Sequence, residues 1–343
     1  MKIWFNQSFS LRNVIARIVR DRPSISLAAS AIDPSAPVRD VAPHFWPEPR
    51  RGTVDYGEWV LSTAIDRNVD ALVAGRGRAA LARMEDRFRN AGIALHVAGD
   101  ARTLDLLDDK AAFAEAMKGD PMLAPTIAVR SAGAFMRAVE VIGTAGAIAC
   151  VKPITGVYGA GYWTLNAAGP FDHLADPDAR RIMPLPYATA LQEMEDQGRS
   201  VALLVMEHLP GLEASVDLVA RRSDVMLAAV RTKLDANRQR IETRHALIPH
   251  AAGLVRRFGL HGAINVQYKR NRDGEWRILE INTRAAGGAS YCDAVGIPFS
   301  TTWADVVTGN AQPFHGEVDA EVVTVMHAVR RPNQNGSAGT SQA

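Results

Sequence analysis

The chain contains the stretch Gly262-Ala263-Ile264-Asn265-Val266-Gln267 and, a little later, Leu279-Glu280-Ile281-Asn282-Thr283-Arg284. Each stretch alternates apolar and polar residues, which is the pattern of a β-strand with one buried face and one polar face. The dipeptide Asp273-Gly274 lies between them and favours a two-residue hairpin turn. The sequence therefore predicts an antiparallel hairpin whose polar face carries several amide and carboxylate side chains.

The turn also predicts which residues face each other in this hairpin. If Arg272 pairs with Glu275, Gln267 lies across from Glu280 and Asn265 lies across from Asn282, so these four polar side chains share one face. The opposite face is then apolar and consists of Ile264, Val266, Leu279 and Ile281. Mg²⁺ prefers hard oxygen ligands such as carboxylate and amide oxygens, so Gln267, Glu280 and Asn282 are candidate metal ligands. The alternative is an ordinary solvated polar face of a sheet.

Upstream, Lys152 ends an apolar strand expected over Ala147–Pro153 and precedes a glycine-rich segment. The glycines of that segment are Gly156, Gly159 and Gly161. A glycine loop beside a strand-borne lysine can fold over nucleotide phosphates through backbone N–H groups and a point charge. No Gly-Lys-Ser/Thr follows, so this is not a Walker loop, and a plain turn is the alternative.

Two further segments carry polar groups that suit a nucleotide. Glu207-His208-Leu209-Pro210-Gly211 follows an apolar strand, and Glu213 comes shortly after, so backbone groups can meet an adenine while carboxylates meet its amine and ribose. An ordinary corner between strands is the alternative. Arg231 and Lys233 share one face of a likely strand, and a basic loop with Arg238, Arg240 and Arg244 follows. This local positive charge suits an anionic ligand, although a charge run is usually a solvated face.

Taken in order, these segments resemble the ATP-grasp superfamily, which includes biotin carboxylase, D-alanine–D-alanine ligase and carbamoyl phosphate synthetase. The resemblance covers roughly residues 100 to 325, and a similarity to ATP-grasp proteins of tellurium-resistance-type gene clusters is also noted. The segments that carry it are Leu107-Asp108-Asp109-Lys110, Val151-Lys152-Pro153 with its glycines, Met206 to Glu213, and the hairpin. Two positions depart from the usual pattern, Gln267 where an acidic residue is common and Thr283 where proline is common.

The resemblance implies a role for each residue. Lys110 and Lys152 would contact ATP phosphates, with Gly156, Gly159 and Gly161 over them. Glu207 and the backbone of His208 and Leu209 would hold the adenine, and Glu213 the ribose. Gln267, Glu280 and Asn282 would hold Mg²⁺, which Mn²⁺ can replace, and Arg284, with Arg231 and Lys233, would stabilise the transferred phosphoryl group. The implied activity is an ATP-dependent ligation of a carboxylate to an amine or a thiol.

The rest of the chain predicts how this unit is framed. Residues 1–100 alternate strands and helices, which predicts a Rossmann-like α/β domain with a parallel sheet. It includes a proline-rich loop with His44 and Trp46, and a single helix over Ala79–Asn90. Residues 101–330 would form the α+β ATP-grasp domain, with a helix over Asp108–Lys118 and a lid subdomain over about 125–205. The polar tail 331–343 is expected to be disordered.

Composition excludes several classes of protein. The 343 residues carry a formal net charge of +2, so a dedicated nucleic-acid binder is not expected. Two cysteines make neither a disulfide framework nor a zinc site, and no apolar run is long enough to span a membrane. We therefore expect a cytoplasmic enzyme of small molecules, and the resemblance allows a homodimer.

Two other functions fit parts of the sequence. Gly75-Arg76-Gly77-Arg78-Ala79-Ala80 follows a strand and Asp100 lies beyond the next one, which resembles a dinucleotide-binding fingerprint and suggests an NAD(P)-dependent oxidoreductase. Arg76 and Arg78 at a helix start could instead hold an anionic substrate. A non-catalytic ATP-binding regulatory protein is the third hypothesis.

Overall fold

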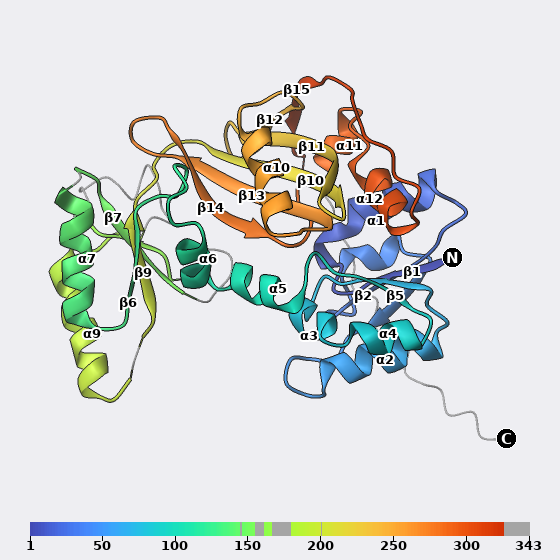
Figure 1. Cartoon of the computed structure of the whole chain (residues 1–343), viewed down its shortest axis with the longest axis horizontal. Helices are drawn as coiled ribbons and strands as arrows, with labels where there is room; N and C mark the ends of the chain where they lie inside the picture. Colours follow the sequence, from blue (N-terminus) through green and yellow to red (C-terminus); the bar gives the residue numbers. More distant parts are fainter. Residues whose placement is uncertain (145, 155–160, 167–179, 200, 326–343) are drawn as a thin grey trace.

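The computed structural model describes residues 1–144, 146–154, 161–166, 180–199 and 201–325. Figure 1 shows an α/β part at one end, a small sheet with two long helices at the other end, and a large twisted sheet between them. The predicted succession of a parallel N-terminal sheet and later antiparallel sheets is confirmed. The tail 331–343 lies outside the described residues, and the division of the chain at residue 100 stays a prediction.

The N-terminal sheet has five parallel strands in the order β3-β2-β1-β4-β5. Its central strands are buried on both faces, which explains their nearly continuous apolar runs. The strands are β1 (Lys2–Phe5), β2 (Ser26–Ala31), β3 (His44–Pro47), β4 (Ala71–Val73) and β5 (Ala94–His96). The helices are η1 (Phe9–Leu11), α1 (Arg12–Asp21), η2 (Pro37–Asp40), α2 (Tyr56–Asp66), α3 (Arg78–Ala82) and α4 (Glu85–Asn90).

Two predictions about local structure were wrong. The proline-rich segment is not all loop, because β3 forms an edge strand, where a proline costs no ladder hydrogen bond. The single helix expected over Ala79–Asn90 is the pair α3 and α4, which meet at Met84. The helix expected over Asp108–Lys118 is present as α6 (Lys110–Ala116), and a helix that was not predicted, α5 (Ala101–Asp108), precedes it.

Asp109 separates α5 from α6. Its backbone is extended, and its carboxylate accepts hydrogen bonds from the N–H groups of Ala111 and Ala112. A side chain that caps the N-terminus in this way starts a new helix and cannot continue the previous one. Lys110 is therefore the first residue of α6.

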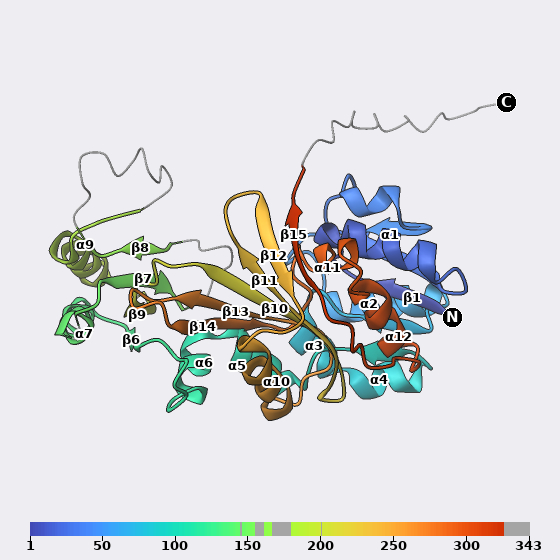
Figure 2. The same ribbon diagram turned by 90° about the horizontal axis from the view of Figure 1, so that it is seen from above.

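The small sheet has the order β6-β9-β7-β8, and each of its pairs is antiparallel. Two helices cover one face, as the side view in Figure 2 shows, and they bury Phe135, Ile142 and Leu191 against the strands. The elements are β6 (Thr126–Val129), α7 (Ala132–Thr144), β7 (Ala149–Pro153), β8 (Trp163–Thr164), α9 (Pro184–Asp196) and β9 (Leu203–Glu207).

The large sheet has six strands in the order β14-β13-β10-β11-β12-β15. Helix α10 (Leu247–Arg257) packs with α5 and α6 on one face. The strands are β10 (Glu213–Arg221), β11 (Asp224–Lys233), β12 (Arg238–Glu242), β13 (Gly262–Arg270), β14 (Trp276–Asn282) and β15 (Asp319–Val323). The arginines expected in a basic loop thus belong to strand β12, apart from Arg244, which follows it.

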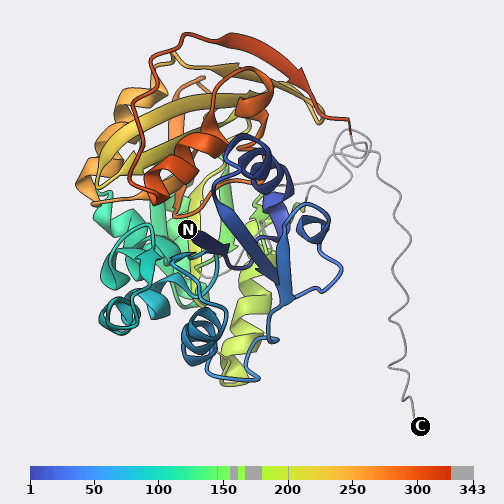
Figure 3. The same ribbon diagram turned by 90° about the vertical axis from the view of Figure 1, so that its right-hand side faces the viewer.

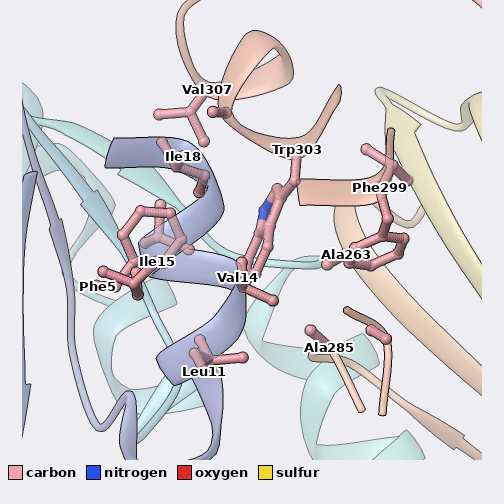
Figure 4. Packing of buried hydrophobic residues seen from close by; sticks show 14 of the residues in the cluster. Phe5, Leu11, Val14, Ile15, Ile18, Ala263, Ala285, Phe299, Trp303 and Val307 are labelled. Atoms are coloured by element: carbon pink, nitrogen blue, oxygen red, sulfur yellow. The ribbon is translucent and has the colours of Figure 1, made fainter. Parts of the chain in front are cut away.

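The other face of the large sheet shares one apolar core with the N-terminal part. Two C-terminal helices, α11 (Tyr291–Ala294) and α12 (Phe299–Val307), lie beside α1, as Figure 3 shows from the side. In Figure 4, Trp303 stands between the N-terminal side chains and Phe299, and its ring meets the edge of Phe5 at 5.1 Å. This shared core fixes the N-terminal sheet against the large sheet.

The hairpin predicted over residues 262–284 is present as β13 and β14, but its turn differs from the prediction. Asn271 pairs with Glu275 and Gly274 adopts φ +82°, so the loop has three residues, 272–274. The ladder shifts register between Gln267 and Tyr268, where Leu279 is the extra residue opposite. This bulge moves Leu279 off the apolar face, and Ile278 takes its place beside Ile264.

No helix in the described ranges is both long enough and apolar enough to cross a membrane.

Candidate active site

The predicted pairs at the site end of the hairpin are confirmed. Asn265 lies opposite Asn282, and Gln267 lies opposite Glu280. These pairs are right although the turn is not. The loop has one residue more than predicted, which shifts the pairing near the turn by one residue, and the extra residue at the bulge shifts it back. The polar side chains therefore share one face of the large sheet.

Asn265 organises this face. It is fully buried, its side-chain oxygen accepts hydrogen bonds from Gln267 Nε2 at 3.3 Å and Asn282 Nδ2 at 3.4 Å, and its amide nitrogen donates to Asp217 at 2.9 Å. Asn282 Nδ2 also donates to Glu280 Oε1 at 2.9 Å. Because the amide nitrogens point inward to Asn265, the side-chain oxygens of Gln267 and Asn282 and one oxygen of Glu280 have no hydrogen-bond partner among the described residues.

This set of open oxygens fits a hard divalent cation. Mg²⁺ commonly uses one or two carboxylates and completes its shell with phosphate and water oxygens. Elsewhere in the described ranges, no three His, Cys, Asp or Glu side chains come together in a metal-binding group. The face offers a single carboxylate, so a cation here would also need the charge of a phosphate ligand.

A buried ion pair lies beneath this face, and sequence reasoning missed half of it. Asp217 is fully buried on β10 and pairs with Arg231 Nε, while Arg231 Nη1 donates to Gln239 at 2.9 Å. The backbone of Gly288 packs so closely that a Cβ there would lie 2.6 Å from Arg231 Nη1. The signal for Asp217 was present, because Glu213, Ser215 and Asp217 alternate along an otherwise apolar strand.

Lys233 and Glu213 form an ion pair with each other at 2.7 Å across β10 and β11. Their side chains are 49% and 28% exposed, so solvent weakens this pair and a ligand can replace either partner. The structure thus brings together two residues that the sequence predicted for different parts of the site.

Two lysines approach the open oxygens from other elements. Burial lowers the pKa of Lys152 on β7, while the nearby charge of Glu280 raises it and that of Lys110 lowers it. Glu280 and Lys110 thus lie within electrostatic range of Lys152, although the three residues are far apart in the sequence. Gly156 and Gly159 lie outside the described residues, and Gly161 has φ +77° with a Cβ position 2.7 Å from Pro153 Cγ.

The segment after β9 lies beside a small apolar cluster. Ala124, Cys150, Met206 and Leu209 form it, with Tyr162 and Leu279 packed against it. Leu279 reaches this cluster only because of the bulge. Burial raises the pKa of the Glu207 carboxyl at the end of β9, and Arg277 lowers it. The cluster thus joins residues of the small sheet to Leu279 of the large sheet.

The backbone of this segment is available only in part. The His208 N–H donates a hydrogen bond to the Ile148 carbonyl at 2.7 Å, and the His208 ring nitrogen Nδ1 is hydrogen-bonded to the Tyr162 hydroxyl at 2.6 Å. The Leu209 N–H makes no hydrogen bond within the described residues. Of the two backbone groups that the sequence singled out, Leu209 is the one left to donate to a ligand.

Arg284 follows β14 and lies near the N-terminal part. Its Nη1 donates to its neighbouring carbonyl, Ala285 O, at 3.3 Å. Burial lowers the pKa of Arg78, Asp108 raises it, and the charge of Arg284 lowers it, so the two guanidinium groups lie within electrostatic range of each other. Arg78 Nη2 contacts both oxygens of Asp108, at 2.9 and 3.0 Å.

The glycine motif in the N-terminal part is closed on itself. Asn6 Oδ1 accepts hydrogen bonds from the N–H groups of Gly75 and Arg76, and α3 has only five residues. Arg76 contacts Glu48 at 3.3 Å and lies 4.1 Å from the Tyr56 ring. A pyrophosphate would need these N–H groups, so this geometry disfavours both the dinucleotide hypothesis and an anion site at Arg76.

Residues 199–329 match the family described as "ATP-grasp in the biosynthetic pathway with Ter operon". No curated protein sequence matches the chain.

Several solved structures share the fold. N5-carboxyaminoimidazole synthetase from Staphylococcus aureus, complexed with ADP, has a TM-score of 0.65 at 14% identity over 91% of this chain and 78% of its own. Biotin carboxylase from Campylobacter jejuni scores 0.62 at 15% identity, with coverages of 91% and 72%. L-amino acid ligase from Bacillus licheniformis scores 0.60 at 12%, with coverages of 89% and 73%. Residues 199–329 thus match an ATP-grasp family, and the chain as a whole shares the fold of these structures.

Proposed function

We propose that this protein is an ATP-dependent ligase that joins a small carboxylic acid to an amine, or to a thiol, through an acyl phosphate. The observation that carries the proposal is the polar face of Gln267, Glu280 and Asn282, whose open side-chain oxygens include a carboxylate within electrostatic range of Lys152. Cation ligands and a lysine in one region, with Lys110 also in range of Lys152, suit a nucleoside triphosphate bound with Mg²⁺.

The nucleotide would lie between the small and the large sheet. The apolar cluster around Cys150, Met206 and Leu279 would hold the adenine, with the Leu209 N–H and the Glu207 carbonyl at its edge. Glu213 would take the ribose after Lys233 releases it. Structures with the same fold that hold ADP, or ADP with magnesium, support the binding of a nucleotide by this fold.

The chemistry then depends on position and charge. A carboxylate oxygen of the acid attacks the γ-phosphorus, the bond to the β,γ-bridging oxygen breaks, and ADP leaves. The amine nitrogen next attacks the acyl carbon, inorganic phosphate leaves, and the nitrogen loses a proton. Bound Mg²⁺ would neutralise phosphate charge, and Gln267, Glu280 and Asn282 would hold it.

The cationic side chains divide into two roles. Lys152, Lys110 and Arg284 would contact phosphate oxygens and offset the charge that builds up during transfer. Arg231 is held by Asp217 and Gln239, so it would position the polar face and the loop at Gly288. Lys233 would act only after its pair with Glu213 opens.

Phosphate release from ATP and Mg²⁺, measured with panels of small acids, amines and thiols, tests this function. We expect release that requires an acid, and a loss of at least about 100-fold in Glu280→Gln, because one transition-state charge contact is worth a few kcal/mol. Glu321→Gln is the matched control, since Glu321 lies on the edge strand β15 of the same sheet and should leave the rate unchanged.

Two results would contradict the proposal. Normal turnover by Glu280→Gln would remove the metal-binding face from the mechanism. Tight MgADP binding, measured by calorimetry, without acid-dependent phosphate release would favour a non-catalytic ATP-binding protein.

A further inference from the structure

A pocket lies directly beyond the candidate metal face, between the carboxyl ends of β1, β4 and β5 and the residues that follow β14. Its cavity volume is about 50 Å³, and Thr283 and Arg284 open into it immediately after Asn282. Most of its wall is apolar and includes Phe5, Leu11 and Trp303, which Figure 4 shows within the shared core. An acid bound here would lie next to the phosphate end of a nucleotide.

Thr283 gives this pocket an unsatisfied polar group. Its side chain is only 2% exposed, and its Oγ1 has no hydrogen-bond partner among the described residues. Buried hydroxyl groups nearly always have a partner, because an unmet one destabilises the fold. A ligand with an oxygen near Thr283 would satisfy this hydroxyl.

Two histidines supply a second polar group with a defined proton. The Arg222 N–H donates to His261 Nδ1 at 3.2 Å, so His261 carries its proton on Nε2. That nitrogen lies 3.2 Å from His96 Nδ1 and donates to it, which leaves the proton of His96 on Nε2. Both rings line the pocket, and His96 Nε2–H has no partner in the described part of the chain.

The histidine pair is neutral at physiological pH. Burial, reinforced by the charge of His261, lowers the pKa of His96 to about 4. Burial and Arg222 also lower the pKa of His261. His96 is therefore a neutral hydrogen-bond donor and does not attract an anion by charge.

The charges on the pocket wall restrict the ligand further. Arg284 is the one charged side chain among the described residues that line it, and no Asp, Glu or Lys does so. A carboxylate would find one cation, but an ammonium group would find no carboxylate and would face Arg284 and the N–H of His96. Burying an unpaired charge in such a place is strongly unfavourable.

We propose that this pocket binds the acid substrate, and that the acid is a small monocarboxylate with a 2-hydroxyl or 2-oxo group and without an ammonium group. The inference rests on the proposed ligase function and narrows its substrate class. The carboxylate pairs with Arg284, the 2-oxygen meets Thr283 Oγ1 and His96 Nε2–H, and a short alkyl chain enters the apolar wall.

Paired acids test the substrate class. Glycolate, lactate and 2-hydroxybutyrate are compared with glycine, alanine and 2-aminobutyrate, which have the same carbon chains. Hydroxylamine replaces the unknown amine and traps the acyl phosphate as a hydroxamate. We expect at least one hydroxy acid, or the matching oxo acid, to react 10-fold or more faster than its amino partner.

The outcomes separate this inference from the proposed function. Equal or faster reaction of the amino acids overturns the inference and leaves the ligase function standing, as does hydroxamate formation only from acids outside both series. No hydroxamate from any acid, together with no acid-dependent phosphate release, overturns the ligase function itself.

A variant at Thr283 gives a readout beyond activity. Thr283→Val keeps the shape and removes the hydroxyl, so KM for the acid should rise about 10-fold while KM for ATP stays the same. Thr283→Ser, the conservative control, should keep the wild-type KM. Without ligand, Thr283→Val should melt at a higher temperature than the wild type, because the unsatisfied hydroxyl is gone. An unchanged KM in Thr283→Val overturns the assignment of this residue.

Discussion

Two clusters of buried or partly buried polar side chains lie near strand ends in this molecule, and they differ in how many of their polar atoms are hydrogen-bonded. In the N-terminal part, Glu48 accepts hydrogen bonds on both oxygens, from Gln7 N–H and Ser30 Oγ on one and from Tyr56 and Arg76 on the other. On the large sheet, Glu280 accepts only one hydrogen bond from the described residues, donated by Asn282.

This difference distinguishes a cluster that stabilises the fold from one that can bind a ligand. A network whose polar atoms are all hydrogen-bonded has no capacity left for a ligand, whereas oxygens without a partner can accept a hydrogen bond or bind a cation. The strand order β3-β2-β1-β4-β5 changes direction between β1 and β4, where α/β sheets often bind ligands. Here the side-chain oxygen of Asn6 accepts hydrogen bonds from the Gly75 and Arg76 N–H groups, so these groups are not available to a ligand. The polar oxygens without a partner lie on the neighbouring large sheet.

The largest effect should come from the ion pair beneath the open face. Asp217→Ala leaves the buried Arg231 without its carboxylate, which should lower the free energy of unfolding by about 3–5 kcal/mol in urea titrations. The double variant Asp217→Ala/Arg231→Met should recover much of this loss, because the uncompensated charge is gone. A double variant as unstable as the single one would show that Asp217 acts by other contacts.

The closed network should respond in stability and not in turnover. Glu48→Gln places an amide nitrogen among donors, so we expect a loss of about 1–3 kcal/mol in the free energy of unfolding. The turnover of the folded protein should stay within about 2-fold of the wild type. Glu58→Gln is the matched control, since its ion pair with Arg87 is half exposed and solvent weakens it. A loss of turnover in Glu48→Gln without a loss of stability would contradict the assignment of this network to the stability of the fold.

The histidine pair predicts a pH dependence of smaller size. The pKa of His96 is lowered to about 4 in the folded protein, below its unfolded value of about 6.5. As the pH falls from about 6.5 to 4, the unfolded chain takes up a proton that the folded protein excludes, so the free energy of unfolding should fall across this window and level off below it. Urea titrations at pH 7 and pH 4.5 measure the change.

His96→Gln should reduce this slope, because the titrating ring is absent. His44→Gln is the control, since His44 is exposed on the edge strand β3. An equal slope in wild type and His96→Gln would assign the pH dependence to other groups.

The smallest stability effect should be at Glu280 itself. Glu280→Gln, which we expect to lose turnover, should change the free energy of unfolding by less than about 1 kcal/mol, because most of the hydrogen-bonding capacity of this carboxylate is unused. A loss as large as that of Glu48→Gln would mean that both clusters serve the fold.

Local patterns in the sequence predicted much of this site. Alternation along β13 and β14 predicted the facing pairs of Asn265 with Asn282 and of Gln267 with Glu280, because a buried face fixes the register. The two-residue turn was wrong, although Asn271 and Gly274 are the residues that a type I turn with a following left-handed glycine prefers. The roles of Lys110, Lys152 and the other predicted site residues stay predictions.

Other features depend on contacts that a single sequence does not reveal. The bulge at Leu279 and the ion pair of Asp217 with Arg231 each depend on a partner on a neighbouring strand. The pocket at Thr283 combines strand ends from the N-terminal part with the end of β14, so no local pattern could locate it.

The bulge at Leu279 has an evolutionary consequence. It divides the hairpin into two ladders, one ending at the loop 272–274 and the other ending at Asn282. A gain or loss of a residue in the loop can be absorbed at the bulge, so it need not shift Gln267 against Glu280. The tip of the hairpin is therefore free to vary in length among descendants of this chain while the cation-facing end keeps its alignment.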